Sequence, residues 1–324
     1  MHPTQTSAAL TRGGIAEDLR RASVWFAAPV GAASLFRVFV EPHYLSGWLV
    51  VWLLLIGLYA FAQRFLLEKP GDGRLRTALV FNFVAINVGF ALIGCFMSAW
   101  PGWRADGMLN SIDRMILGCD TASLFGRWSN PWVGTLAVLG YSSFILFFLY
   151  LAFSEAFVLS AWTGKIQKGF MMLYGLGYSG YLLLPASGPI FAHEGKPLLL
   201  PQSHFAAGLN SWLTSCCLGV DAWPSLHAGV CLFTVVWVWR RWPKALAFFV
   251  PAGIALLFGA LYLHYHYLVD ILTGGALGIA CSVSVLSEAR RGAAVPAKVP
   301  ARSPAPTGAS QGPAAGRLPV PDAE

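Results

Sequence analysis

Two short stretches in the last third of the chain carry side chains suited to nucleophilic chemistry. The first, Trp-Pro-Ser-Leu-His, ends at His227, and the second, His-Tyr-His-Tyr-Leu-Val-Asp, spans 264–270. His266 and Asp270 are four residues apart, so on a helix they share a face and the carboxylate can bond one imidazole nitrogen. That bond would fix the tautomer and leave the lone pair of the other nitrogen free to attack, as in catalytic triads.

The first stretch also suits an anion. Pro224 is pre-shaped for the start of a helix, and the N–H groups of a first helical turn, together with the Ser225 hydroxyl, favour phosphate. His264 points away from His266 on a regular helix, where it could support the structure or contact the same phosphate. The pattern predicts His227, His266 and Asp270 as catalytic residues and Ser225 and His264 as substrate-binding residues.

The elements between the two stretches can bring them to one place. Apolar residues fill 225–240 and 245–261. At about 1.5 Å per residue each leg is roughly 25 Å long, so the hairpin returns the chain to the level where it began. His227, His266 and Asp270 should therefore meet at one interface, where an ionisable Asp at the edge of an apolar span usually has a function.

The composition is typical of an integral membrane protein. Of the 324 residues, 56% are hydrophobic and only 11% are charged, whereas about 25% are charged in a typical soluble domain. The apolar blocks are long enough to cross a bilayer, which takes about 20 residues per helix. The 13 Trp and 10 Tyr fit the aromatic belts of membrane interfaces. The predicted spans are 22–40, 46–63, 78–100, 132–154, 169–187, 225–240, 245–262 and 267–286.

We therefore predict an all-α fold, a polytopic transmembrane bundle of about seven or eight helices whose last three spans carry the catalytic residues. The first span is interrupted by Pro29 and crowded by Arg37 and Glu41, so it could instead lie at the interface. The predicted divisions are a cytoplasmic segment (1–21), a membrane domain (22–286) and a disordered tail rich in Pro, Ala and basic residues (287–324).

Basic residues mark every second connection between the predicted spans, as cytoplasmic loops do. They are Arg12, Arg20, Arg21, Arg64, Lys69, Arg74, Arg76, Lys165, Lys168, Arg240, Arg241, Lys244, Arg290 and Arg291. The pattern places the N-terminus inside and the catalytic residues at the non-cytoplasmic face of a plasma or inner membrane. Because the net charge of +7 resides in these connections and the tails, it does not indicate a nucleic-acid partner.

Two long connections, 101–130 and 188–223, would face outside. One disulfide could form among Cys119, Cys216 and Cys217, although no paired spacing requires it. Single histidines at an interface are usually structural, which is our prediction for His43, His193 and His204.

Pro-Ser-Leu-His at 224–227 and His-Tyr-Leu-Val-Asp at 266–270 resemble the type-2 phosphatidic acid phosphatase superfamily. Leu226, and His264 paired with His266, look most like its inositol phosphorylceramide synthase branch. The resemblance is sharp over 223–278, which includes Gly274, Gly275 and Gly278, and looser over 113–153 and 178–189.

The resemblance implies that His266 is a nucleophile that becomes phosphorylated. Asp270 would orient it and His227 would protonate the leaving group, without a metal or another cofactor. One departure is that Gly259 and Ala260 stand where the phosphatases of the superfamily carry a Ser-Arg pair. The Lys…Arg-Pro element that clamps phosphate is also missing. The replacement charge could come from Arg104, Arg114, Arg127 or Lys196.

The predicted function is transfer or hydrolysis of a phosphate-containing group of a membrane lipid, with a polyol or a lipid hydroxyl as the transfer acceptor. An alternative is a lipid phosphate or polyprenyl pyrophosphate phosphatase. Two other classes stay open. In a metal-dependent membrane hydrolase, His227, His264, His266 and Asp270 would be ligands; in a non-enzymatic transporter, Asp270 would be a coupling site.

Overall fold

The computed structural model describes residues 5–41, 47–98, 102–126, 128–154, 159–192 and 201–294. Over these residues the chain is helical, and its only strand-like pairing is an isolated parallel bridge between Ala186 and Asp221. The predicted all-α fold is confirmed. The helices are α1 (Gln5–Val40), α2 (Gly47–Leu66), α3 (Asp72–Ser98), α4 (Asp106–Leu117), α5 (Thr121–Gly126), α6 (Pro131–Ser142), α7 (Phe144–Phe153), α8 (Thr163–Leu183), α9 (Pro189–Ala192), α10 (His204–Ser215), α11 (Leu226–Arg241), α12 (Leu246–Tyr262) and α13 (Leu268–Ala294).

Six stretches of the described residues are long and apolar enough to cross a membrane: Thr11–Val40, Leu49–Leu66, Asp72–Met97, Pro131–Phe153, Pro243–Tyr262 and Leu268–Glu288. They fit an integral membrane protein, as predicted. The two other predicted spans, 169–187 and 225–240, correspond to α8 and α11. Helix α8 carries Gln167 and Lys168 inside the bundle, and helix α11 has only 16 residues. A count of seven or eight spans stays a prediction.

Several boundaries differ from the predicted ones. The first helix begins at Gln5 rather than near residue 22 and continues through Pro29. The last helix continues to Ala294, so 287–294 is helical. The predicted span 132–154 consists of two helices that meet at Ser143. The predictions for Arg127, Lys196, His43, His193 and the tail from 295 onward concern residues outside the described ranges.

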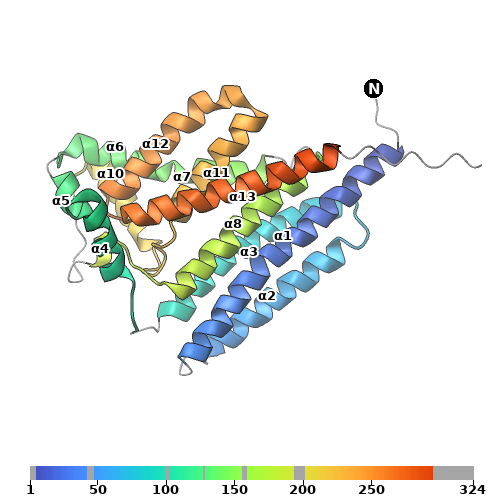
Figure 1. The fold of residues 1–324 in the computed structure, drawn as a ribbon, viewed down its shortest axis with the longest axis horizontal. Coiled ribbons are helices and arrows are strands. Elements are labelled where there is room, and N and C mark those ends of the chain that lie inside the picture. The colour runs from blue at the N-terminus through green and yellow to red at the C-terminus, as the bar shows by residue number, and fades with distance from the viewer. Residues whose placement is uncertain are drawn as a thin grey trace, which may run out of the picture.

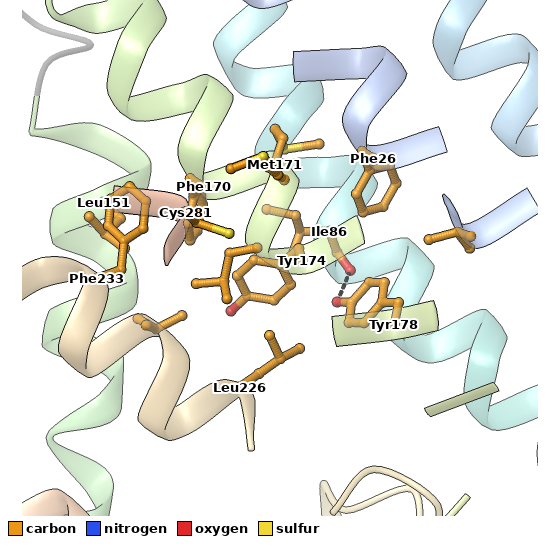
Figure 2. Close-up of a cluster of buried hydrophobic side chains, with 14 of the residues drawn as sticks. Phe26, Ile86, Leu151, Phe170, Met171, Tyr174, Tyr178, Leu226, Phe233 and Cys281 are labelled. Atoms are coloured by element: carbon orange, nitrogen blue, oxygen red, sulfur yellow. Dashed lines mark hydrogen bonds between the residues drawn. The ribbon is translucent and has the colours of Figure 1, made fainter. Parts of the chain in front are cut away.

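The central helix α8 is buried along most of its length and lies beside α1, α3 and α13 (Figure 1). Its tyrosines join a cluster with Phe26 of α1, and the Tyr178 hydroxyl donates a 2.8 Å hydrogen bond to the Ile86 carbonyl of α3 (Figure 2). Leu226, the first residue of α11, reaches the same cluster and lies against Gly177. The start of α11 is thereby anchored to the core.

The two ends of the bundle differ in chemistry. The start of α1 and the end of α13 lie at one end (Figure 1), where Lys165 pairs with Asp18 at 2.9 Å and Lys168 contacts Glu288. The short helices α4, α5 and α10 gather at the other end. That second end also holds the start of α11 and the turn between α12 and α13, which carry the predicted catalytic residues.

Glycines bring α11 and α13 into close contact below this turn. A Cβ atom at Gly274 would lie 2.0 Å from the Ser225 carbonyl oxygen, and one at Gly278 would lie 2.0 Å from the Gly229 carbonyl oxygen. Small residues let helix backbones approach in this way within membranes. The contact sets the position of His227 relative to the start of α13.

Candidate active site

The two predicted catalytic histidines meet. His227 is the second residue of α11, and His266 lies in the turn that precedes α13. Nε2 of His266 is 3.2 Å from Nδ1 of His227. The His266 ring is 3% exposed, whereas His227 is partly exposed, so His227 lies between His266 and the open side of the site.

Two acceptors face the other nitrogen of His266. Its Nδ1 is 3.0 Å from the Ala222 carbonyl oxygen and 3.6 Å from Oδ2 of Asp270. Both neighbours are acceptors, so the Nδ1 position carries the proton and Nε2 carries the lone pair. The structure therefore brings Asp270 to His266 as the spacing predicts, although His266 is not on the helix.

Asp270 also makes two hydrogen bonds with backbone groups. Its Oδ2 accepts a 2.8 Å hydrogen bond from the Tyr267 N–H, and its own carbonyl oxygen accepts one of 3.1 Å from the Ser225 N–H. These bonds tie the start of α13 to the start of α11. Asp270, the residue predicted to orient His266, therefore also joins the two helices of the site.

The two predicted substrate-binding residues are buried. Ser225 is the N-cap of α11, and its hydroxyl accepts a 3.3 Å bond from the Ala228 N–H. Pro224 precedes this cap instead of occupying the first helical turn. His264 has a left-handed backbone, with φ of 62°, and its carbonyl oxygen accepts from Ile190. Neither residue is part of the cavity wall described next, so their contact with substrate stays a prediction.

A cavity of about 320 Å³ lies beside His227. Its wall comes from α3, α6, α7, α8, α10 and the start of α11. The aromatic members are Phe90, Tyr141, Phe144, Phe148, Tyr174, Tyr178, Tyr181 and Trp212. Rings of Tyr141 and Phe144 lie 4.7 and 4.3 Å from the His227 ring. Asn87 and Ile145 belong to the wall and are also exposed on the outer surface of α3 and α7. The cavity therefore reaches the outer surface of the helix bundle.

Asp221 is an ionisable group of this wall that the sequence reading missed. Burial raises the pKa of its carboxyl, opposed by backbone N–H groups and by the nearby His266. Its Oδ1 accepts a 3.1 Å hydrogen bond from the Leu218 N–H. One signal was present in the sequence, because an Asp within the apolar run before Ser225 is costly unless it has a role.

No Lys or Arg is part of the cavity wall within the described ranges. Of the candidates for a phosphate clamp, Arg104 bonds the Gly219 carbonyl and Arg114 pairs with Asp120 at 3.5 Å.

Within the described ranges, no group of three or more His, Cys, Asp and Glu side chains is arranged to hold a metal ion. The six cysteines are free thiols, so the disulfide that the sequence allowed is not formed.

Comparisons with known proteins indicate the family of the chain. A family model described as the PAP2 superfamily matches residues 109–283. The catalytic subunit of inositol phosphorylceramide synthase from Schizosaccharomyces pombe is 24% identical over 196 residues, which cover 54% of this chain and 46% of that protein. Inositol phosphorylceramide synthase from Candida albicans is 22% identical over 238 residues, 68% of this chain and 50% of that protein. The chain thus spans about half the length of these relatives. No solved structure matches it significantly.

Proposed function

Because the chain belongs to the PAP2 superfamily, we propose that it transfers a phosphate-containing head group from a lipid donor to a hydroxyl acceptor through a phosphohistidine at His266. The observation that carries the proposal is the 3.2 Å approach of the two imidazoles, with the far nitrogen of His266 held by Ala222 and Asp270. The family and the apolar helices by themselves support action on phosphate groups of membrane lipids.

The first step forms a bond between Nε2 of His266 and phosphorus. The lone pair of Nε2 attacks, the phosphorus–oxygen bond to the donor breaks, and protonated His227 gives its proton to the leaving oxygen. Phosphorus must bind where Nδ1 of His227 now lies, 3.2 Å from Nε2 of His266, so the His227 ring has to turn aside. Its partial exposure beside the cavity provides the space.

The second step reverses these roles. Neutral His227 takes the proton of an acceptor hydroxyl, the acceptor oxygen attacks phosphorus, and the bond to Nε2 breaks. Asp270 offsets the positive charge that develops on the His266 ring while the phosphoryl group is attached. Two acceptors at Nδ1 keep the ring in the same orientation through both steps.

Two observations favour transfer over hydrolysis. Both curated relatives are named for the synthesis of inositol phosphorylceramide, which favours a lipid hydroxyl as acceptor and an inositol phosphate as the transferred group. The cavity wall also lacks a basic side chain within the described ranges. A phosphodiester carries less charge than a phosphate monoester, so it needs fewer clamping cations.

We further propose that the site faces away from the cytoplasm, in a plasma or inner membrane. Basic residues of several predicted cytoplasmic connections meet at the opposite end, where Arg12 pairs with Asp72 at 2.6 Å and Arg20 bonds the Leu67 carbonyl. The positive-inside rule assigns such an end to the cytoplasm.

The test is product analysis with purified protein and a donor phospholipid labelled in its phosphate. The expected result is a labelled lipid product when ceramide or diacylglycerol is supplied, and no turnover by His266→Ala. His204→Ala is the matched control, because His204 is exposed at the start of α10, and it should retain activity.

Two results would contradict the proposal in different ways. Normal turnover by His266→Ala would exclude the phosphohistidine. Release of free phosphate alone, whichever hydroxyl acceptor is supplied, would make the protein a lipid phosphatase with the same nucleophile.

A further inference from the structure

Helix α4 presents two carboxylates to the turn that carries the nucleophile. Asp106 and Asp113 are seven residues apart, so they lie two turns apart on one face of the helix. Both accept hydrogen bonds from groups outside α4, and Asp113 is fully buried. A buried carboxylate is costly, and it persists where hydrogen bonds stabilise its charge.

Asp113 caps the catalytic helix from another element. Its Oδ2 accepts a 2.6 Å hydrogen bond from the Leu268 N–H, and its Oδ1 accepts one of 3.0 Å from the Val269 N–H. These are the first two residues of α13, whose third residue is Asp270. The free N–H groups of a helix start are usually satisfied by a local N-cap. Here they are satisfied by a residue more than a hundred positions earlier in the chain.

Asp106 holds the other side of the same turn. Its carboxylate accepts 3.0 Å bonds from the N–H groups of Ser187 and Gly188, and Oδ1 accepts a 3.1 Å bond from the Tyr267 hydroxyl. The 187–190 segment lies directly on the turn. A Cβ atom at Gly188, where φ is +84°, would lie 2.3 Å from the Tyr265 carbonyl oxygen. The Ile190 N–H also donates a 2.7 Å bond to the His264 carbonyl.

We propose that Asp113 and Asp106 are positioning residues that hold His266 in line with His227 from outside the catalytic helices. The inference rests on the proposed function, since it assumes that His266 is the nucleophile. His266 lies in an irregular turn, where no helix fixes its ring. A reacting group must be held within about 0.5 Å of its productive position. The bonds from α4 reach the residues after His266 directly, and they reach His264 through the 187–190 segment.

The variants Asp113→Asn and Asp106→Asn test the proposal in the full-length purified protein. An amide keeps the size of the side chain but has one accepting oxygen, so Asn at 113 cannot accept both the Leu268 and the Val269 N–H as the two oxygens of Asp113 do. At position 106 the change removes the negative charge that three donors face. The expected result is a fall in kcat of about ten- to a hundredfold, typical of residues that orient a reacting group, with little change in KM. Asp120→Asn is the matched control, because the Asp120 carboxylate accepts from the Ser123 N–H and pairs with Arg114 within the same connection instead of bonding the turn. It should behave like the wild type.

A double-mutant cycle separates positioning from general stability. If Asp113 acts through the catalytic turn, Asp113→Asn should add little to the loss already caused by Asp270→Asn, because coupled sites are not additive. Tyr267→Phe removes a single hydroxyl from Asp106 and should cost a few-fold in kcat, which provides a milder variant if an Asp replacement does not fold.

Two results would overturn the inference. One is that the losses in kcat from Asp113→Asn and Asp270→Asn are fully additive. The other is that Asp113→Asn and Tyr267→Phe have the same kcat as the control Asp120→Asn. The proposed function fails separately, by normal activity of His266→Ala.

Discussion

At the residue scale, the orientation of His266 depends on a backbone carbonyl as well as on a carboxylate. The Ala222 carbonyl oxygen is 3.0 Å from Nδ1, and Oδ2 of Asp270 is 3.6 Å away. In a Ser-His-Asp triad the carboxylate alone sets the tautomer, and its loss costs about 10⁴ in rate. Here the carbonyl keeps the proton on Nδ1 even when the carboxylate charge is removed.

We therefore predict that Asp270→Asn loses less activity than the Asp replacement in such a triad. The loss should reflect only the missing charge next to the imidazolium, on the order of 10²–10³ in kcat. Single-turnover measurement of phosphoenzyme formation would show it, with His266→Ala as the inactive reference. A loss as complete as that of His266→Ala would show that the Ala222 carbonyl does not hold the tautomer.

Asp221 gives a prediction about stability. Burial raises the pKa of its carboxyl. A carboxyl with a raised folded-state pKa favours the folded protein while it is protonated, and that advantage is lost as pH rises from the unfolded pKa through the raised one. Asp221→Asn removes the cost of burying the ionised carboxylate at high pH, and the amide oxygen can still accept the Leu218 N–H. Thermal unfolding in detergent at pH 8 should then show a higher midpoint than the wild type, and the difference should shrink at pH 4. An unchanged or lower midpoint at pH 8 would contradict this account.

What the sequence could predict at this scale was limited to side chains. His227, His266 and Asp270 have types and spacing that identify them, and the structure brings them together. The Ala222 carbonyl gives no such signal, since every residue has one. The sequence did not predict the hydrogen bonds of Asp113 to the start of α13 either, because they join segments 155 residues apart.

At the scale of elements, the close approach of α11 and α13 sets the distance between the two histidines. Gly274 and Gly278 allow it, since any Cβ there would overlap a carbonyl of α11. We predict that Gly274→Ala separates the helices and lowers both the unfolding midpoint and kcat, with a cost of about 1–3 kcal/mol from overpacking. Gly57→Ala is the control, because a Cβ at Gly57 in α2 meets nothing within 4 Å. That change should be neutral or slightly stabilising. Equal behaviour of the two variants would show that the contact does not fix the site.

The elements that position the site were predicted unevenly. The hairpin of α11 and α12 was found because long apolar runs indicate spans directly. The connection 101–130 was read as an outer loop, whereas it contains α4 and α5. Short amphipathic helices with charged residues do not stand out in a search for apolar spans. Helix α4, which bonds the turn that carries His266, was therefore among the helices that the sequence did not predict.

At the scale of the whole molecule, the two ends of the bundle carry different chemistry. Lys165 and Lys168 join α1, α8 and α13 through Asp18 and Glu288 at one end. The histidine pair, Asp221 and the short helices lie at the other. The charge pattern of the sequence predicts the cytoplasmic side at the first end. The apolar helices fit a membrane but do not by themselves say which end faces which side.

Thiol labelling can settle the orientation. Gly208 of α10 at the site end and Gly73 of α3 at the basic end are both exposed helical glycines, and a Cβ atom at either meets nothing within 4 Å. They can thus be replaced by Cys without disturbing their neighbours, in a background in which the six native cysteines are changed to Ser or Ala. In sealed cells a membrane-impermeant maleimide should label Gly208→Cys and should label Gly73→Cys only after permeabilisation. That result would place His227 and His266 outside, so donor and acceptor would be taken from the outer leaflet. The reverse pattern would invert the topology and place the reaction at the cytoplasmic leaflet, with the chemistry of the site unchanged.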